Sequence, residues 1–169
     1  MDAAGLKQLQ EPLKASYRME PGAAVITLRA EGTLDADKIA CNLATGRAIA
    51  AAGLHPLAGG SGAELCSGDM LLEALVACAG VTMKAVATAL EIPLRNARVT
   101  AEGDLDMRGT LGVAKDAPVG FSAIRLRFDV ESDAPQDKLD TLVKLTERYC
   151  VVFQTLSQRP ALSVALARG

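Results

Sequence analysis

The stretch DMLLEALVACAGVTMKAVATAL (69–90) decides the fold of this chain. Apolar side chains fall on nearly every face of it, and a helix that is apolar all round is buried on all sides. Ser67 or Asp69 can cap its start, and Pro93 stands a few residues beyond its end. Twenty-odd residues at ~1.5 Å each span about 33 Å, the width of a small domain. We therefore expect one helix that runs through the middle of the protein.

The chain after this helix predicts two strands, a helix and a last strand. Residues 94–107 and 119–131 are the strands, and the run FSAIRLRFDV within the second alternates apolar and charged side chains, as a strand with one buried face does. Residues 135–149 predict an amphipathic helix. Its apolar stripe consists of Leu139, Leu142, Val143 and Leu145. ALSVALA (161–167) predicts the final strand.

The chain before the central helix is less regular. Residues 13–31 hold two β-prone runs around the turn pair Pro21-Gly22, which predicts a hairpin. Residues 32–55 fit either a strand pair or a short helix. Residues 56–68 are rich in glycine and predict a loop with unusual backbone angles. The whole order, over one domain of residues 1–169, indicates an α+β fold with antiparallel sheet.

Composition narrows the classes of partner and the compartment. The net charge is −2 and basic residues are scattered, so we expect no nucleic acid partner. The apolar run Leu71–Val81 is interrupted by Glu73 and is too short to cross a membrane. No secretory signal is visible at the N-terminus, so we expect a cytoplasmic, reducing location. There the four cysteines are free or redox-active rather than structural. They are Cys41, Cys66, Cys78 and Cys150.

Cys78 is the first candidate for chemistry. Its neighbours Ala77, Ala79 and Gly80 are small and leave a thiol approachable. Apolar surroundings disfavour the thiolate, however, so on its own Cys78 reads as an inert core thiol that needs an outside cation, such as an arginine, to react. Cys150 has the same bland interpretation, and only the fold could bring it to Cys78. Cys66 and Cys41 add no signal beyond a loop or core position.

Other kinds of site are disfavoured. The chain has one histidine, His55, and no close group of Cys and His, so we expect neither a metal nor a cofactor. His55 precedes Pro56 and is expected to serve the geometry of its loop. GGSG (59–62) lacks the lysine of a phosphate-binding loop. Asp69 and Glu73 suit the helix dipole. A sharper hypothesis makes one of them orient an arginine beside a thiolate, although neither shares a helix face with Cys78.

The segment SGDMLLEALVACAGVTMKAVATALEIPL (67–94) resembles the central-helix signature of the OsmC/Ohr family. That signature has an acidic residue, a leucine-rich turn, small residues, a cysteine, and a Thr or Ser soon after. The family's second mark is a cysteine after the last long helix, and YCVVFQTL (149–156) occupies that place. The resemblance covers the chain from about residue 53 to its end.

The resemblance implies a fold, an activity and partners. The fold is an intertwined homodimer with antiparallel sheets wrapped around paired central helices. The activity is that of a thiol peroxidase in oxidative stress defence, which reduces organic hydroperoxides. Cys78 would attack the peroxide and become a sulfenic acid, and Cys150 would resolve it as a disulfide. A dithiol reductant such as a lipoylated protein would then restore both thiols.

The sequence departs from the family's peroxidase pattern at three places. Active members carry a glutamate ten residues before the cysteine, where this chain has Gly68 followed by Asp69. Val151 and Phe153 replace the proline and the histidine after the second cysteine. No motif marks the arginine that activates the thiolate. By position the candidates are Arg18, Arg29 and Arg47. We take Asp69 and Arg18 as the supporting residues.

Two other functions fit the same pattern. A non-catalytic member could bind a small apolar molecule at the dimer interface, as the weakened activating set and the helix rich in Ala, Val and Leu suggest. A redox sensor would use the same cysteines as a peroxidase. Turnover of peroxide together with the absence of a co-purifying ligand would reject the binding hypothesis.

Overall fold

The computed structural model describes residues 2–19, 32–34, 40–44, 49–112 and 114–168. Its helices are α1 (Ala3–Met19), α2 (Ser67–Ala89), α3 (Met107–Thr110), α4 (Gln136–Tyr149) and α5 (Val151–Ser157), with a 3-10 turn, η2 (Pro56–Ala58). Its strands are β1 (Gly32–Leu34), β2 (Ala40–Ala44), β3 (Ile49–Gly53), β4 (Leu65–Cys66), β5 (Arg95–Leu105) and β6 (Phe121–Glu131). The fold is α+β, as predicted.

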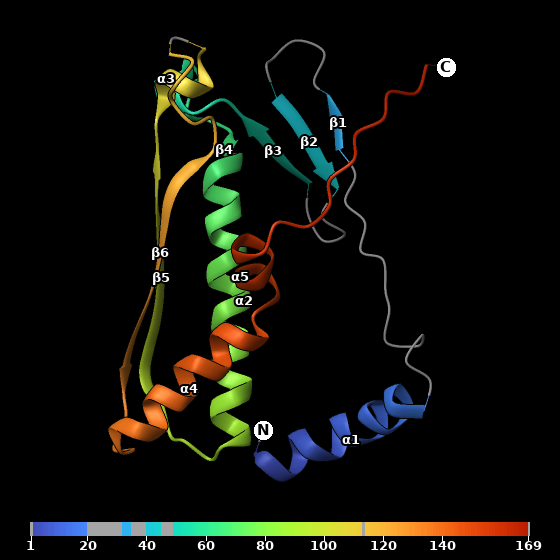
Figure 1. The fold of residues 1–169 in the computed structure, drawn as a ribbon, viewed down its shortest axis with the longest axis vertical. Coiled ribbons are helices and arrows are strands. Elements are labelled where there is room, and N and C mark those ends of the chain that lie inside the picture. The colour runs from blue at the N-terminus through green and yellow to red at the C-terminus, as the bar shows by residue number, and fades with distance from the viewer. Residues whose placement is uncertain (1, 20–31, 35–39, 45–48, 113, 169) are drawn as a thin grey trace.

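The long helix α2 forms the axis of this arrangement. The hairpin of β5 and β6 lies along one side of α2, and α4 and α5 pack on another side (Figure 1). The buried positions on α2 recur every fourth residue, so they form one stripe. They are Leu75, Ala79, Met83 and Ala87. This stripe carries the core of the described chain.

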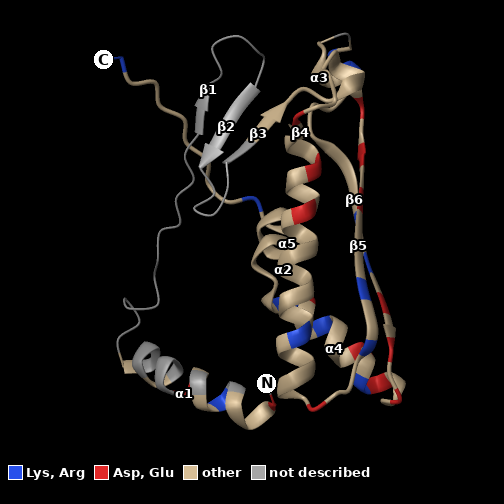
Figure 2. Cartoon of the chain, turned by 180° about the vertical axis from the view of Figure 1, so that it is seen from behind, with Lys and Arg blue, Asp and Glu red and all other residues tan. Residues whose placement is uncertain are grey.

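The prediction that α2 is buried on all sides is wrong for the single chain. The face opposite the buried stripe is open, with Val81 73% exposed and Ala74 and Ala77 also exposed. Figure 2 shows few charged residues along α2. We call Ala74, Ala77 and Val81 the exposed α2 face. Its apolar character explains why the sequence reads as a helix apolar all round, although one chain alone covers only part of it.

Burial is divided between two clusters that α2 joins. One gathers Met83, Ala87, Ile92 and Leu142, where α4 crosses the far end of α2. The other gathers Leu75, Ala79 and Cys150. Phe128 of β6 packs against both. The second cluster therefore places a cysteine in the core at the middle of α2.

The hairpin of β5 and β6 confirms the two predicted strands. They pair antiparallel, with Val99 opposite Phe128. Their outward residues are charged and exposed, and Arg125 and Asp104 form an ion pair on that surface, with Nη2 and Oδ1 2.7 Å apart. Gly103 lets the hairpin close over α2, because a Cβ there would lie 2.6 Å from the ring of Phe121. The alternating sequence thus sets which face covers the helix.

The N-terminal part corrects one prediction and decides another. Residues 13–19 belong to helix α1 and not to a hairpin, because the apolar spacing of three and four in the sequence starts earlier, at Leu6. The rest of that hairpin, 20–31, lies outside the described residues. Within residues 32–55 the strand alternative holds, and the short helix is wrong. β1, β2 and β3 pair antiparallel in order, and β4 joins β3 in parallel.

The loop before α2 matches its prediction in part. Gly59 and Gly62 adopt positive φ of 90° and 77°, the unusual angles expected of this glycine-rich segment. His55 serves the loop as predicted, since its Nδ1 accepts the backbone N–H of Leu57 at 3.1 Å. The cap of α2 differs: neither Ser67 nor Asp69 but Cys66 occupies that position, without a side-chain hydrogen bond.

In the C-terminal part the predicted helix is confirmed, and the predicted strand is not found. The helix at 135–149 is α4, with Leu142 buried, Leu139 and Val143 packed against the core and Leu145 outside that cluster. Residues 161–167, predicted as a strand, form none in the described chain and are exposed. A strand needs a neighbour to satisfy its backbone, and none of the described strands pairs with this segment.

Helix α2 is longer than the apolar run Leu71–Val81 that the sequence analysis judged too short to cross a membrane. By length and composition alone its 23 residues could cross a membrane, since an 18-residue window within them has a mean hydropathy of 1.7. The core helix of a soluble protein passes the same test, so one such helix is weak support for a membrane role.

Candidate active site

Two cysteines from distant parts of the sequence meet in the core. Cys78 lies at the middle of α2 and is partly buried. Cys150 is fully buried and stands at the corner where α4 ends and α5 begins, with φ −73° and ψ 107°. Its N–H donates to the Thr146 carbonyl at 2.9 Å, and its carbonyl accepts from the Gln154 N–H at 2.9 Å. The corner therefore holds Cys150 rigidly against α2.

The Cys78 side chain packs against the cluster that contains Cys150, and each thiol influences the pKa of the other. Burial is the largest influence on Cys78 and raises its pKa, but the backbone N–H of Val152, the Cys150 thiol, the Val151 N–H and the Thr82 hydroxyl outweigh it. The pKa of Cys78 therefore lies below its ordinary value of 9.0. Within the described part of the chain, these neutral donors are the groups that stabilise the Cys78 thiolate.

Cys150 is shifted the other way. Burial raises its pKa, and the nearby Cys78 sulfur raises it further, while the N–H groups of Phe153 and Val152 oppose this only in part. Because the two groups interact, they lose protons in two steps that belong to the pair. The first step leaves a thiolate at Cys78 and a thiol at Cys150. Such a pair supplies a nucleophile and, beside it, a second sulfur able to form a disulfide.

Of the two predicted supporting residues, only Asp69 has a described side chain, and the structure does not bring it to this pair. Asp69 and Glu73 are exposed near the start of α2, and neither affects the pKa of Cys78. Arg18 lies in α1, with its side chain outside the described residues. Arg29 and Arg47 also lie outside them. Among the described residues, no cation contributes to lowering the pKa of Cys78.

Sequence reasoning missed the donors that do surround Cys78. The N–H groups of Val151 and Val152 come from the backbone, so residue identity carries no signal for them. Thr82 could have been found, because it follows Cys78 by four residues and therefore shares its helix face. Among the described residues, no group of three His, Cys, Asp or Glu side chains could hold a metal ion.

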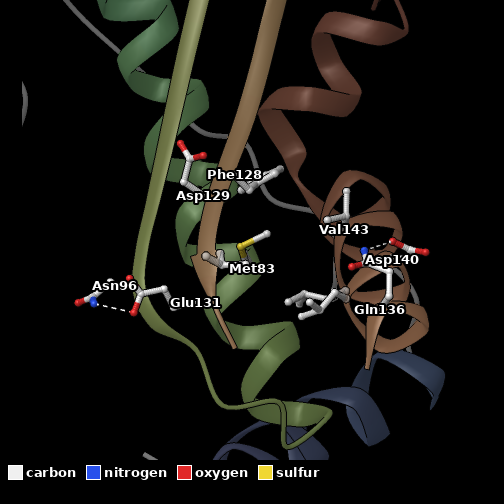
Figure 3. A pocket seen from close by; sticks show the side chains of 11 residues that line it. Met83, Asn96, Phe128, Asp129, Glu131, Gln136, Asp140 and Val143 are labelled. Carbon is white, nitrogen blue, oxygen red and sulfur yellow. Dashed lines mark hydrogen bonds between the residues drawn. The ribbon is translucent and has the colours of Figure 1, made fainter. Parts of the chain in front are cut away.

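Three cavities in the described part of the chain are lined by neither cysteine of the pair. One cavity, of about 480 Å³, lies between α4 and the end of the hairpin and is lined by Met83, Phe128 and Val143 among others (Figure 3). A second, of about 580 Å³, lies near the other side of the pair and contains Leu75, Phe153 and Arg159. Neither cavity is lined by Cys78 or Cys150. A third cavity, of about 360 Å³, lies at the start of α2, and Cys66 and His55 line it.

Solved structures with the same arrangement are known. An OsmC-like protein from Mycoplasma pneumoniae aligns over 79% of this chain and 89% of its own, with 16% identity and a TM-score of 0.66. An organic hydroperoxide resistance protein OsmC from Legionella pneumophila aligns over 78% and 91%, with 15% identity and a TM-score of 0.60. At these identities the likeness shows the fold alone.

The sequence comparison is more direct. No curated protein matches the chain. The family model for OsmC-like proteins matches residues 60–165, which include the central helix, the hairpin and both cysteines of the pair. The chain therefore belongs to the OsmC-like protein family.

Proposed function

We propose that this protein is a thiol-dependent peroxidase that reduces organic hydroperoxides, with Cys78 as the attacking and Cys150 as the resolving cysteine. The observation that carries the proposal is the packing of Cys78 against the core cluster that contains Cys150, together with a lowered pKa at Cys78 and a raised pKa at Cys150. Some structural neighbours are named hydroperoxide resistance proteins, which agrees with this activity.

The reaction follows from the order in which the thiols ionise. The Cys78 thiolate attacks the outer oxygen of the hydroperoxide, the O–O bond breaks, and the alkoxide takes a proton and leaves as an alcohol. Cys78 is then a sulfenic acid. The Cys150 sulfur attacks it, a disulfide forms, and water leaves with the sulfenic oxygen. Two thiols of an external dithiol restore both cysteines by exchange.

A stoichiometric oxidation tests the proposal. Reduced protein receives one equivalent of cumene hydroperoxide, and the cysteine peptides are then mapped by mass spectrometry. We expect a Cys78–Cys150 disulfide and one equivalent of cumyl alcohol. The variant Cys150→Ser should stop at the sulfenic acid, trapped with dimedone, while Cys66→Ser should behave as the wild type. If Cys78 remains a thiol while peroxide persists, the protein is no peroxidase.

The same proposal includes partners and a compartment. The exposed α2 face (Ala74, Ala77 and Val81) is apolar and opposite the core, so we propose that a second copy covers it in a homodimer. A dithiol such as a lipoylated protein would be the reductant. The cytoplasm suits it, because a resting pair of thiols requires a reducing compartment.

A second candidate function rests on the cavity that contains Leu75 and Phe153. It is open, has a mixed polar and apolar lining, and is adjacent to the thiol cluster. A non-catalytic member could bind a small apolar molecule there. Native mass spectrometry of protein taken directly from cells tests this: a defined added mass, lost on denaturation, would support it. Peroxide turnover without any bound ligand would reject it.

A further inference from the structure

Thr82 stands one helical turn after Cys78 on α2. The two side chains share one face of the helix, because residues four apart are neighbours there. The Thr82 hydroxyl is partly buried and donates a hydrogen bond to the Cys78 carbonyl, with the two oxygens 2.8 Å apart. This bond anchors the hydroxyl at the turn that carries the thiol.

A bond of this kind has an ordinary explanation, which Thr88 illustrates. On the same helix, the Thr88 hydroxyl donates to the Lys84 carbonyl at the same 2.8 Å. Threonines inside helices often satisfy their hydroxyl in this way. Thr82 differs in its neighbour, since the carbonyl it bonds belongs to the reactive cysteine. Against the burial that raises it, Thr82 is one of the donors that lower the pKa of Cys78.

We propose that Thr82 is a positioning residue for Cys78, whose hydroxyl turns from the Cys78 carbonyl to the Cys78 sulfur when the thiol ionises. A hydroxyl has one proton, so it serves one acceptor at a time. The proton of the thiol leaves to solvent, and the proton of Thr82 stays on its oxygen and changes only its acceptor. The inference rests on the function proposed above, for which it identifies a donor that stabilises the attacking thiolate.

Removal of this donor has a measurable consequence. A hydrogen bond to a charged group is stronger than one to a neutral group, so its loss destabilises the thiolate more than the thiol. For Thr82→Val, which keeps the shape and removes the hydroxyl, we expect the pH midpoint of Cys78 ionisation to rise by about one unit. Below the midpoint, the rate of alkylation should fall about tenfold. Thr82→Ser retains the hydroxyl and should behave as the wild type.

The test measures alkylation of Cys78 by iodoacetamide against pH on the native chain. Peptide mass spectrometry resolves Cys78 from the other cysteines, and far-ultraviolet circular dichroism checks each fold. Thr88→Val is the matched control, since it removes the same backbone bond from the same helix without a thiol nearby. If Thr82→Val does not fold, Thr82→Ala replaces it. A raised midpoint in the Val or Ala variant alone, with the Ser variant and the control unchanged, supports the proposal.

Three results would overturn it: an unchanged midpoint without the hydroxyl, an equal shift in Thr82→Ser, or an equal shift in the Thr88→Val control. The last two would mean that packing, and not the hydroxyl, sets the ionisation. Alkylation uses no peroxide, so this result is independent of the activity. A shifted midpoint in a protein that leaves cumene hydroperoxide intact would reject the peroxidase and retain the role of Thr82.

Discussion

At the scale of the residue, the chemistry depends on how one environment separates two identical side chains. Cys78 and Cys150 share a cluster, yet hydrogen-bond donors favour the thiolate at Cys78 and burial opposes it at Cys150. The division of roles therefore follows from surroundings and needs no difference in residue type.

This division predicts two separate ionisation midpoints. Folding lowers the pKa of Cys78 below 9.0 and raises that of Cys150 above it. As pH rises, Cys78 should therefore become reactive first, at a pH where cysteines of the urea-unfolded chain are mostly thiols, and Cys150 last. Alkylation followed peptide by peptide measures both midpoints. Equal midpoints for the two cysteines, or the reverse order, would contradict the assignment of attacker and resolver.

Single residues also show where sequence reasoning succeeds and where it stops. The sequence identifies Cys78 and Cys150 only through a resemblance, because spacing alone cannot bring residues 72 positions apart into contact. The acidity of Cys78 comes partly from the N–H groups of Val151 and Val152, which any residue but proline would supply. Such donors depend on backbone geometry, so a residue pattern does not reveal them.

At the scale of the element, periodic segments were predictable and segments without internal partners were not. The alternation in β6 and the apolar stripe of α4 are visible within each element's own sequence, and each indicates a buried face. The segment 161–167 alternates too, but a strand exists only beside another strand. The prediction of a hairpin over 13–31 starts at residue 13 and leaves out Leu6 and Leu9, whose spacing indicates the helix α1. A longer window corrects this error, but not the error at 161–167.

The contact of the hairpin with α2 depends on Gly103. A methyl group there would lie 2.6 Å from the Phe121 ring and 3.4 Å from Leu72, while the same ring lies close to Gly68. The ring would have to shift to admit this methyl group, so Gly103→Ala should destabilise the fold by about 1–3 kcal/mol. Urea unfolding measures this. Gly120→Ala is the control, since its added carbon meets nothing within 4 Å. Similar losses in both variants would show that the contact is unimportant.

At the scale of the whole molecule, the described chain leaves one face of its central helix exposed. Only one stripe of α2 is buried, although the sequence is apolar on nearly every face. The apolar pattern of a sequence reflects the surface that is buried in the functional assembly, whereas the structure of one chain shows only the surface that this chain buries. The mismatch is what the proposed homodimer would explain.

A charge on the exposed α2 face tests this. Val81→Glu should leave the fold of each chain intact, because Val81 is 73% exposed. If two copies meet on this face, the buried carboxylate should weaken their association by several kcal/mol, and so by more than a hundredfold. Sedimentation velocity over a range of concentrations measures this. Val119→Glu is the control at a comparably exposed valine, 68%, on another surface. A wild type that sediments as a monomer would remove the basis of the prediction.

The corner that holds Cys150 has a further consequence once the two sulfurs are joined. A Cys78–Cys150 bond would tie the last helices to the central one and close a covalent ring of about 72 residues, which restricts the unfolded chain far more than the folded one. Chain entropy then gives the oxidised form about 4 kcal/mol of extra stability. Calorimetry should find a higher melting temperature after one equivalent of peroxide, reversed by dithiothreitol and absent in Cys150→Ser. The oxidised protein would therefore be more stable to unfolding than the reduced one. Its reductant would have to break a disulfide that stabilises the fold.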